Sequence, residues 1–309
     1  MLQNFRNLKE VLQKFTDDAV CRHWLESQRW DGVPVCAHCG HQGAYKLGDG
    51  KTYKCSSKEC HKKFTVTKGT VFENTNIPLN TWFAAVYLAT AHKKGISSLQ
   101  LSRDLGITQK TAWFMLHRIR KAFTVNAPEM LENLVEMDET YIGGKAANKT
   151  NKQRKKLKEG TGYINKTPVF GILERNGNVI VQPVTEAKGE TLMPIITQRV
   201  SADAICVTDG FGGYKDLKNS FKAHEIINHA QNEYSRGIYH TNTIEGFWSL
   251  LKRGIYGIYH QVSPKHLHRY CDEFAYRYNS RKLPDNERFS LSLKHIDGRL
   301  TYKKLIGKE

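Results

Sequence analysis

Four cysteines near the N-terminus constrain this chain more than any other feature of its sequence. They form a C-x2-C pair and a C-x4-C pair, with 15 residues between the pairs: Cys36, Cys39, Cys55 and Cys60. Zinc takes four tetrahedral thiolate or imidazole ligands, and two such pairs on tight turns supply them. The stretch between the pairs has the Gly and Asp content of a β-hairpin. We therefore predict a zinc ribbon over residues 31–72 that holds one structural Zn²⁺.

Other interpretations of these cysteines compete with a site of four thiolates. A disulfide pair is disfavoured because the chain is predicted to be intracellular, and thiols stay reduced inside the cell. The second pair is wider than usual, so His41 or His61 could replace one cysteine ligand. Four protein ligands leave the metal no open position for water, which makes the predicted site structural rather than catalytic.

Composition and charge narrow the class of protein further. The 309 residues suggest about two domains, and 39% hydrophobic with 25% charged residues excludes a mostly disordered chain, a collagen and a membrane protein. The longest apolar run, residues 82–91, is ten residues long, against the roughly 20 that a spanning helix needs. The N-terminus lacks the unbroken apolar stretch of a signal peptide. A net charge of +17 indicates a polyanionic partner.

Helices are expected on both sides of the ribbon, over residues 1–30 and, as three helices, over residues 78–126. Gly106 stands where the turn before the last helix requires a positive φ, and Thr108 is placed to cap that helix. This spacing is typical of a DNA-binding helix-turn-helix, whose last helix enters the major groove. The expected contacts are Gln109, Lys110 and Thr111 at the groove, with Arg118 and Arg120 toward the DNA backbone. A plain packing unit of three helices stays the alternative.

Residues 131–285 change to strands and helices in a mixed α/β order, which is the order of ribonuclease H. Asp138 lies inside the first predicted strand, and Asp209 ends a short buried strand. Residues 131–144 carry four acids and no base within a basic chain, which indicates a cation site. An unpaired Asp buried on a strand is costly, so both carboxylates need a functional reason.

A helix around residues 240–253 is predicted to complete this site. At 100° per residue its apolar side chains form one stripe, opposite a polar set of Asn242, Glu245, Ser249 and Lys252. Crowded carboxylates repel unless a divalent cation lies between them, and two Mg²⁺ or Mn²⁺ ions roughly 3.5–4 Å apart can support in-line phosphoryl transfer. Asp138 is expected to bridge the metals and Asp209 to hold one, with the helix supplying the last ligand. Lys252 and Arg253 are expected to bind DNA phosphates.

These motifs together resemble a known family. The sequence is similar to insertion-sequence transposases of the DDE superfamily, of the ISXO-type branch with an N-terminal zinc ribbon. The matching motifs are CAHCG, MDETYIGGK, TDGFGGY, HTNTIEGFWSLLKRGIYGIYH and SPKHLHRYCDEFAYRYNSR. The resemblance implies a multidomain α+β chain with a ribonuclease-H-like catalytic domain that uses Mg²⁺. It further implies a cytoplasmic, nucleoid-associated protein of prokaryotic type that cuts transposon ends in double-stranded DNA and joins them to target DNA.

The third catalytic ligand stays open between two residues. Asp209 and Glu245 have 35 residues between them, the spacing usual in DDE enzymes. Asn242 is separated from Asp209 by 32 residues, and many members of this branch have Asn at the corresponding position. Both lie on one helical face, and we favour Glu245 because a carboxylate binds Mg²⁺ more strongly than an amide. Asn242 is then an accessory ligand.

The remaining predictions concern flanking segments, assembly and rival functions. The basic segment 145–168 is expected to be a loop that closes on DNA phosphates through Lys155 and Lys156, unless it only solubilises the chain. Residues 286–309 are expected to form a C-terminal tail. Two transposon ends must be held together, so a homodimer or larger homo-oligomer on DNA is expected. The rivals are a transposase-derived DNA-binding regulator without catalysis and a metal-dependent nuclease.

Overall fold

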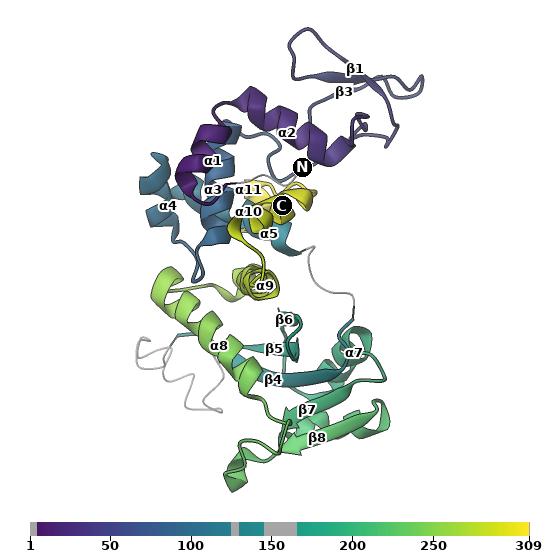
Figure 1. Ribbon diagram of the computed structural model, residues 1–309, viewed down its shortest axis with the longest axis vertical. Coiled ribbons are helices and arrows are strands. Elements are labelled where there is room, and N and C mark those ends of the chain that lie inside the picture. Colours follow the sequence, from purple (N-terminus) through teal and green to yellow (C-terminus); the bar gives the residue numbers. More distant parts are fainter. Residues whose placement is uncertain (1–4, 125–129, 145–165, 309) are drawn as a thin grey trace. The chain divides into compact units, whose positions relative to one another are not determined.

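The chain divides into two compact units. The computed structural model describes residues 5–124, 130–144 and 166–308, and Figure 1 shows its elements. Unit 1 consists of Met1–Val125 together with Lys282–Glu309, and unit 2 is Asn126–Arg281. Most of the predicted basic loop, including Lys155 and Lys156, lies outside the described residues. Within the described ranges, no helix has the length and apolar character needed to span a membrane.

Unit 1 begins with two helices and a small antiparallel sheet. The helices are α1 (Leu8–Lys14) and α2 (Asp18–Trp30), and the sheet has the order β1 (Ala44–Lys46), β2 (Tyr53–Cys55) and β3 (Lys63–Phe64). Asp49 closes the predicted hairpin by accepting the N–H groups of Lys51 and Thr52. One face of the sheet packs on Trp30, whose ring lies edge-on to Tyr53 at a centroid distance of 4.9 Å. The ribbon is therefore anchored on the end of α2 (Figure 1).

The three predicted helices between residues 78 and 126 are present. They are α3 (Leu79–Ala91), α4 (Ser98–Leu105) and α5 (Gln109–Phe123). Gly106 has a φ of 64° at the end of α4, and the Thr108 hydroxyl accepts the N–H of Thr111 at the start of α5. The expected inward side chains of α5 are buried, namely Ala112, Leu116 and Ile119. The positions of these helices therefore follow from their caps and from one apolar stripe.

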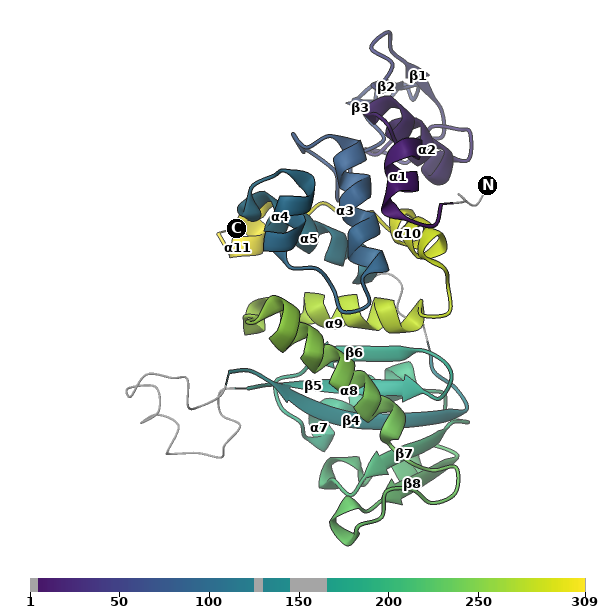
Figure 2. The ribbon, with the colours of Figure 1, turned by 60° about the vertical axis from the view of Figure 1, so that its left-hand side comes forward.

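The C-terminal segment is not the tail that the sequence predicted. It forms α10 (Asp285–Lys294) and α11 (Tyr302–Ile306) as part of unit 1, and α10 lies beside α1 and α3 in Figure 2. Phe289 is fully buried among four aromatic rings at centroid distances of 5.2–5.9 Å: Phe5, Phe15, Trp24 and Phe83. The apolar side chains of this segment complete the N-terminal core, and this is why it folds back.

Unit 2 is built on a five-stranded mixed sheet of order β6-β5-β4-β7-β8. Its strands are β4 (Leu134–Ile142), β5 (Thr167–Glu174), β6 (Val179–Pro183), β7 (Ile205–Asp209) and β8 (Ala223–Ile227). The first three form an antiparallel meander that turns at Asn176, which has a φ of 62°, while β7 and β8 run parallel to β4. The mixed α/β order predicted for this region is confirmed.

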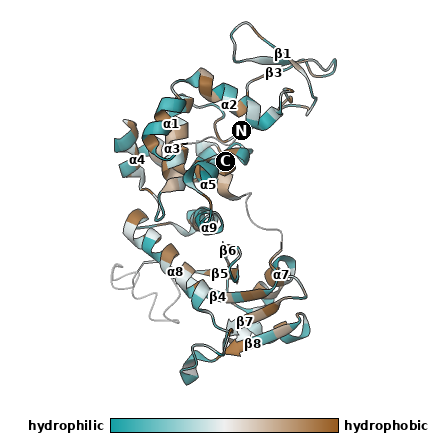
Figure 3. Cartoon of the chain, viewed as in Figure 1, coloured by the Kyte–Doolittle hydropathy of each residue, from teal (hydrophilic) through white to brown (hydrophobic). Residues whose placement is uncertain are grey.

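Helices cover both faces of this sheet. One core joins the sheet to α7 (Gly189–Arg199), and the other joins it to α8 (Asn242–Gly254) and α9 (Pro264–Asn279). Short turns complete the unit: η3 (Gly212–Tyr214), η4 (Leu217–Asn219), η5 (His229–Gln231) and the π-helical η6 (Ile255–Tyr259). Hydrophobic and hydrophilic colours alternate along α8, as expected for a helix with one buried side (Figure 3). The helix α8 crosses the sheet over β4 and β5 (Figure 2), and this crossing positions the site.

Replacing Phe289 with Ala tests whether the C-terminal segment belongs to the core of unit 1. We expect the free energy of unfolding to fall by about 3–5 kcal/mol, because the change removes a fully buried ring and leaves a cavity. Urea unfolding followed by Trp fluorescence measures this loss. The control is Leu12→Ala, whose side chain is exposed and whose loss should stay within about 0.5 kcal/mol. Equal losses in both variants would show that α10 does not hold the core together.

Candidate functional site

The four predicted zinc ligands meet at one point beside the small sheet. Their sulfur atoms all lie within 4.8 Å of one another, with Cys36 to Cys60 at 3.9 Å and Cys39 to Cys55 at 3.7 Å. A tetrahedron with Zn–S bonds of about 2.3 Å has edges of about 3.8 Å, whereas a disulfide needs about 2.05 Å. The geometry therefore fits a zinc site of four cysteines and does not fit a disulfide.

Backbone N–H groups favour the thiolate at Cys36, whereas burial raises the pKa of the Cys55 thiol to about 12. Burial opposes the charged form of Cys36, but the N–H groups of His38 and Cys39 bring the pKa of its thiol down to about 7. A lower pKa favours the thiolate, which is the form that binds zinc. The His41 ring bonds instead to the Ser56 hydroxyl at 3.0 Å, and neither His41 nor His61 joins the four-ligand cluster.

The residues predicted to contact DNA on α5 divide into two groups. The first group lies in the first turn of α5, where Gln109 and Lys110 are exposed and Thr111 is partly buried. Their contact with DNA stays a prediction. Arg118 and Arg120 are only 3% and 2% exposed, so the prediction that they face the DNA backbone is wrong. Arg118 donates to the carbonyl of Glu73 and stacks over the rings of Trp82 and Phe114. The interior position of α5 within unit 1 explains the error, because sequence alone assigned two charged side chains to a solvent face.

Asp138 and Asp209 lie on neighbouring strands of the sheet. The parallel pairing of β4 with β7 ends with Glu136 opposite Val207, and each aspartate follows that last pair by two residues. Burial is the main cause that raises the pKa of Asp138 to about 6; the charges of Asp209 and Glu245 act in the same direction, and hydrogen bonds from the Glu139 backbone and Trp248 oppose them. The two predicted aspartates and Glu245 are therefore electrostatic neighbours.

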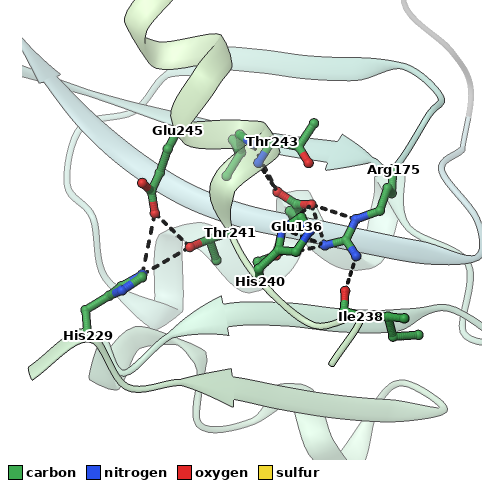
Figure 4. Close-up of polar contacts among 9 residues, drawn as sticks. Glu136, Arg175, His229, Ile238, His240, Thr241, Thr243 and Glu245 are labelled. Atoms are coloured by element: carbon green, nitrogen blue, oxygen red, sulfur yellow. Dashed lines mark hydrogen bonds and ion pairs between the residues drawn. The ribbon is translucent and has the colours of Figure 1, made fainter. Parts of the chain in front are cut away.

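The third predicted group lies on the exposed face of α8. Asn242, Glu245, Ser249 and Lys252 are exposed as expected, and so is Arg253, while Ile244, Phe247, Trp248 and Leu251 form the buried stripe. Glu245 accepts a hydrogen bond from the Thr241 hydroxyl at 2.9 Å and lies 3.5 Å from the His229 ring (Figure 4). Among the described residues the carboxylates do not form as tight a group as the four thiols. Three carboxylates are nevertheless a donor set that suits Mg²⁺ or Mn²⁺, and the charges of Asp209 and Glu245 both act on Asp138.

Trp248 connects α8 to Asp138 through a contact that the sequence did not predict. Its indole N–H donates to Asp138 Oδ2 at 2.8 Å. Gly171 lies directly opposite Asp138 on β5, and a Cβ there would come within 2.6 Å of the Trp248 ring. A glycine is therefore required on β5 for the indole to reach the carboxylate.

Glu136 makes a second connection between β4 and α8 (Figure 4). It is fully buried and shares a face of β4 with Asp138, two residues along the strand. Its Oε2 accepts the N–H groups of Thr243 and Ile244 at 3.0 Å each, and its Oε1 accepts Arg175 at 2.6 Å. No side chain of its own caps α8, so this carboxylate from the sheet takes that role. The start of α8 is thus tied to the strand that carries Asp138.

Arg175 extends this contact to the chain that leads into α8. Its guanidinium donates to the carbonyls of Ile238 and His240, and to the ring of His240 at 3.1 Å. The segment before the helix is therefore pinned to the β5–β6 hairpin. The sequence showed four acids near residue 138, but not which of them was structural.

Glu139 occupies the opposite face of β4 from Asp138. The Tyr214 hydroxyl donates to it at 2.6 Å, and burial raises the pKa of Glu139 to about 7, with further contributions from Asp138 and Asp209. Since Tyr214 follows Asp209 by five residues, this bond holds the turn after β7 against β4. The only feature of the sequence that pointed to Glu139 was its position next to Asp138.

Comparison with known proteins assigns the family. Residues 130–279 match the ISXO2-like transposase domain, and residues 16–63 match the transposase zinc-ribbon domain. The chain belongs to the ISXO2-like transposases that carry this ribbon.

Relatives from two organisms agree with this assignment. An uncharacterized protein in transposable element ISH50 of Halobacterium salinarum is 27% identical over 285 residues, covering 89% of this chain and 96% of the relative. An uncharacterized transposase-like protein of Haemophilus influenzae is 30% identical over 100 residues, covering 32% of this chain and 80% of that protein.

Two solved structures show a weaker likeness. A simian T-cell lymphotropic virus intasome in complex with PP2A regulatory subunit B56 gamma has a TM-score of 0.23 and 15% identity, and the match covers 71% of this chain and 64% of that one, less than two thirds of its length. The Mos1 strand transfer complex has a TM-score of 0.21 and 13% identity, covering 69% and 78%. At these scores neither likeness carries an argument about fold or function.

Metal analysis tests the four-cysteine site. We expect one zinc per chain in the purified protein, and loss of most of that zinc in Cys36→Ser, because three thiolates and a hydroxyl bind zinc far more weakly than four thiolates. Cys206→Ala changes a buried cysteine outside the cluster and should keep its zinc. Full zinc retention in Cys36→Ser would contradict the assignment.

Replacing Glu136 with Gln tests the connection between β4 and α8. The amide keeps the shape but leaves Arg175 without its carboxylate, so we expect the free energy of unfolding to fall by about 3–5 kcal/mol. Urea unfolding followed by fluorescence of Trp248 and the other tryptophans reports the change. The matched control is Glu225→Gln, which breaks the more exposed pair with Arg236 and should cost at most about 1 kcal/mol. Similar losses in the two variants would argue against a special role for Glu136.

Proposed function

We propose that this protein is a DNA transposase that binds the terminal inverted repeats of its element and catalyses Mg²⁺-dependent strand cleavage and strand transfer. The observation that carries the proposal is that Asp138 and Asp209 each follow the last pair of the parallel β4–β7 ladder by two residues, and that the charges of Asp209 and Glu245 both act on the Asp138 carboxylate. The meander of β6, β5 and β4, continued by parallel β7 and β8 and crossed by α8, supports a ribonuclease-H-like catalytic domain. Membership of a transposase family supports the same reaction.

The proposed chemistry is phosphoryl transfer on DNA, first to water and then to a 3′-hydroxyl. Asp138 and Asp209 would hold two divalent ions together with Glu245, and Asn242 is an accessory ligand one turn before it. Bound Mg²⁺ supplies activation of the attacking oxygen and stabilisation of the leaving oxygen. Lys252 lies two turns beyond Glu245 on the exposed side of α8, from where its ammonium group can hold a phosphate beside the scissile bond.

DNA recognition is assigned to exposed basic and polar side chains in both units. Gln109, Lys110 and Thr111 begin α5 after a glycine turn, as a recognition helix does. Arg253 follows Lys252 on α8, and the net charge of +17 supplies a general attraction to DNA. The proposed partner is double-stranded DNA in the nucleoid, bound by a homodimer or larger homo-oligomer because two ends must be joined.

Strand transfer in vitro tests this function. The donor carries the repeats that flank the gene, with Mg²⁺ or Mn²⁺ present, and joined products are measured on a gel. We expect wild type to give joined products and Asp138→Ala to lose them by a factor of at least about 10³, because a metal-bridging carboxylate is removed.

Two further variants assign the third ligand. If Glu245 is that ligand, Glu245→Gln should lose joining as fully as Asp138→Ala, while Asn242→Ala keeps a measurable fraction. The reverse ranking would assign Asn242 instead. Wild type that binds the ends but never cuts them, with either metal, would favour the DNA-binding regulator, and cutting without joining would favour the nuclease.

A further inference from the structure

The outer face of the zinc ribbon carries one aromatic and two basic side chains in a row. Tyr45 on β1 pairs directly with Lys54 on β2, and Lys54 pairs directly with Lys63 on β3. Residues that are directly opposite in an antiparallel sheet share a face, and all three side chains are exposed. Tyr45 is 67% exposed. The row therefore faces away from Trp30, Tyr53 and Phe64, which anchor the sheet.

The charges of this row are uncompensated, in contrast to the charge on the anchored side. Lys46 pairs with Glu26 of α2 at 3.4 Å and lies over the Tyr53 ring. Lys54 and Lys63 have no acidic partner within ion-pair distance among the described residues. Like charges directly opposite on neighbouring strands destabilise a sheet. A bound anion placed between the two ammonium groups would relieve this repulsion.

We propose that Tyr45, Lys54 and Lys63 form a binding surface for the phosphate backbone of double-stranded DNA. Strands lie about 4.8 Å apart, so the row spans about 10 Å, a width that fits within the roughly 12 Å major groove or along one of its edges. The two ammonium groups contact phosphates, and the Tyr45 hydroxyl donates to a phosphate or sugar oxygen. This surface is separate from α5 and from the carboxylates of unit 2. It rests on the proposed function only in that DNA is the ligand.

The salt dependence of DNA binding tests the surface. The test variant is Lys54→Gln with Lys63→Gln in the full-length zinc-loaded protein. The matched control is Lys9→Gln with Lys14→Gln, which removes the same charge from exposed lysines of α1 in the same unit. Affinity for a duplex carrying the element end is measured between 50 and 200 mM salt. Each lost phosphate contact lowers the slope of log K against log salt by about 0.9, so we expect the test variant to lose about 1.8 and the control much less.

Further variants separate contact from folding. Zinc content should remain at one per chain in every variant, and Lys54→Arg with Lys63→Arg should restore the wild-type slope because the charge is kept. Tyr45→Phe should weaken binding about 2- to 10-fold if its hydroxyl contacts DNA. Equal slopes for the test and control variants would overturn the surface while leaving wild-type binding and joining intact. Wild type that neither binds nor joins the ends would overturn the proposed function and this surface together.

Discussion

Unit 2 depends on one buried carboxylate. A charged group taken out of water is costly unless it is paired and hydrogen-bonded, and Glu136 meets this requirement with groups from two different parts of the fold. Arg175 supplies the opposite charge from the end of β5, and the first amides of α8 supply the hydrogen bonds at the positive end of the helix dipole. The carboxylate is satisfied only when sheet, hairpin and helix are all in place.

Two residues further along β4, the same face carries Asp138, the acid that the sequence predicted to be functional. Asp138 meets α8 at Trp248, four to five residues, or a little over one turn, beyond the amides that Glu136 binds. Glu245 lies between these two points of attachment, so its carboxylate is held at a defined place along the strand. Gly171 makes this approach possible because any larger residue would push the indole away. The geometry of the site is thus set by a pair of acids with different tasks on one strand.

Unit 1 is built from two segments that lie at opposite ends of the sequence. The chain leaves unit 1 at residue 125, forms unit 2, and returns at residue 282 to complete the first core. Phe289 packs among aromatic rings from the first 83 residues. Unit 2 is therefore attached to unit 1 at both of its ends. The zinc ribbon is stabilised separately, by four thiols and by Trp30, since its strands are too short to form a core.

The sequence by itself determined those features that depend on short-range spacing. Two cysteine pairs predicted the four-cysteine cluster, and caps with a 3.6-residue period located α4, α5 and α8. The strand positions of Asp138 and Asp209 also followed from the sequence, while their roles stay predictions. Tertiary structure decided which charged residues face solvent. Arg118 and Arg120 are buried, and Glu136 serves α8 through partners 39 and 107 residues away. From sequence alone, a charged residue is assigned to the surface because burying an unpaired charge is costly. The partner that offsets this cost can lie far away along the chain, so it is identified only in the folded structure.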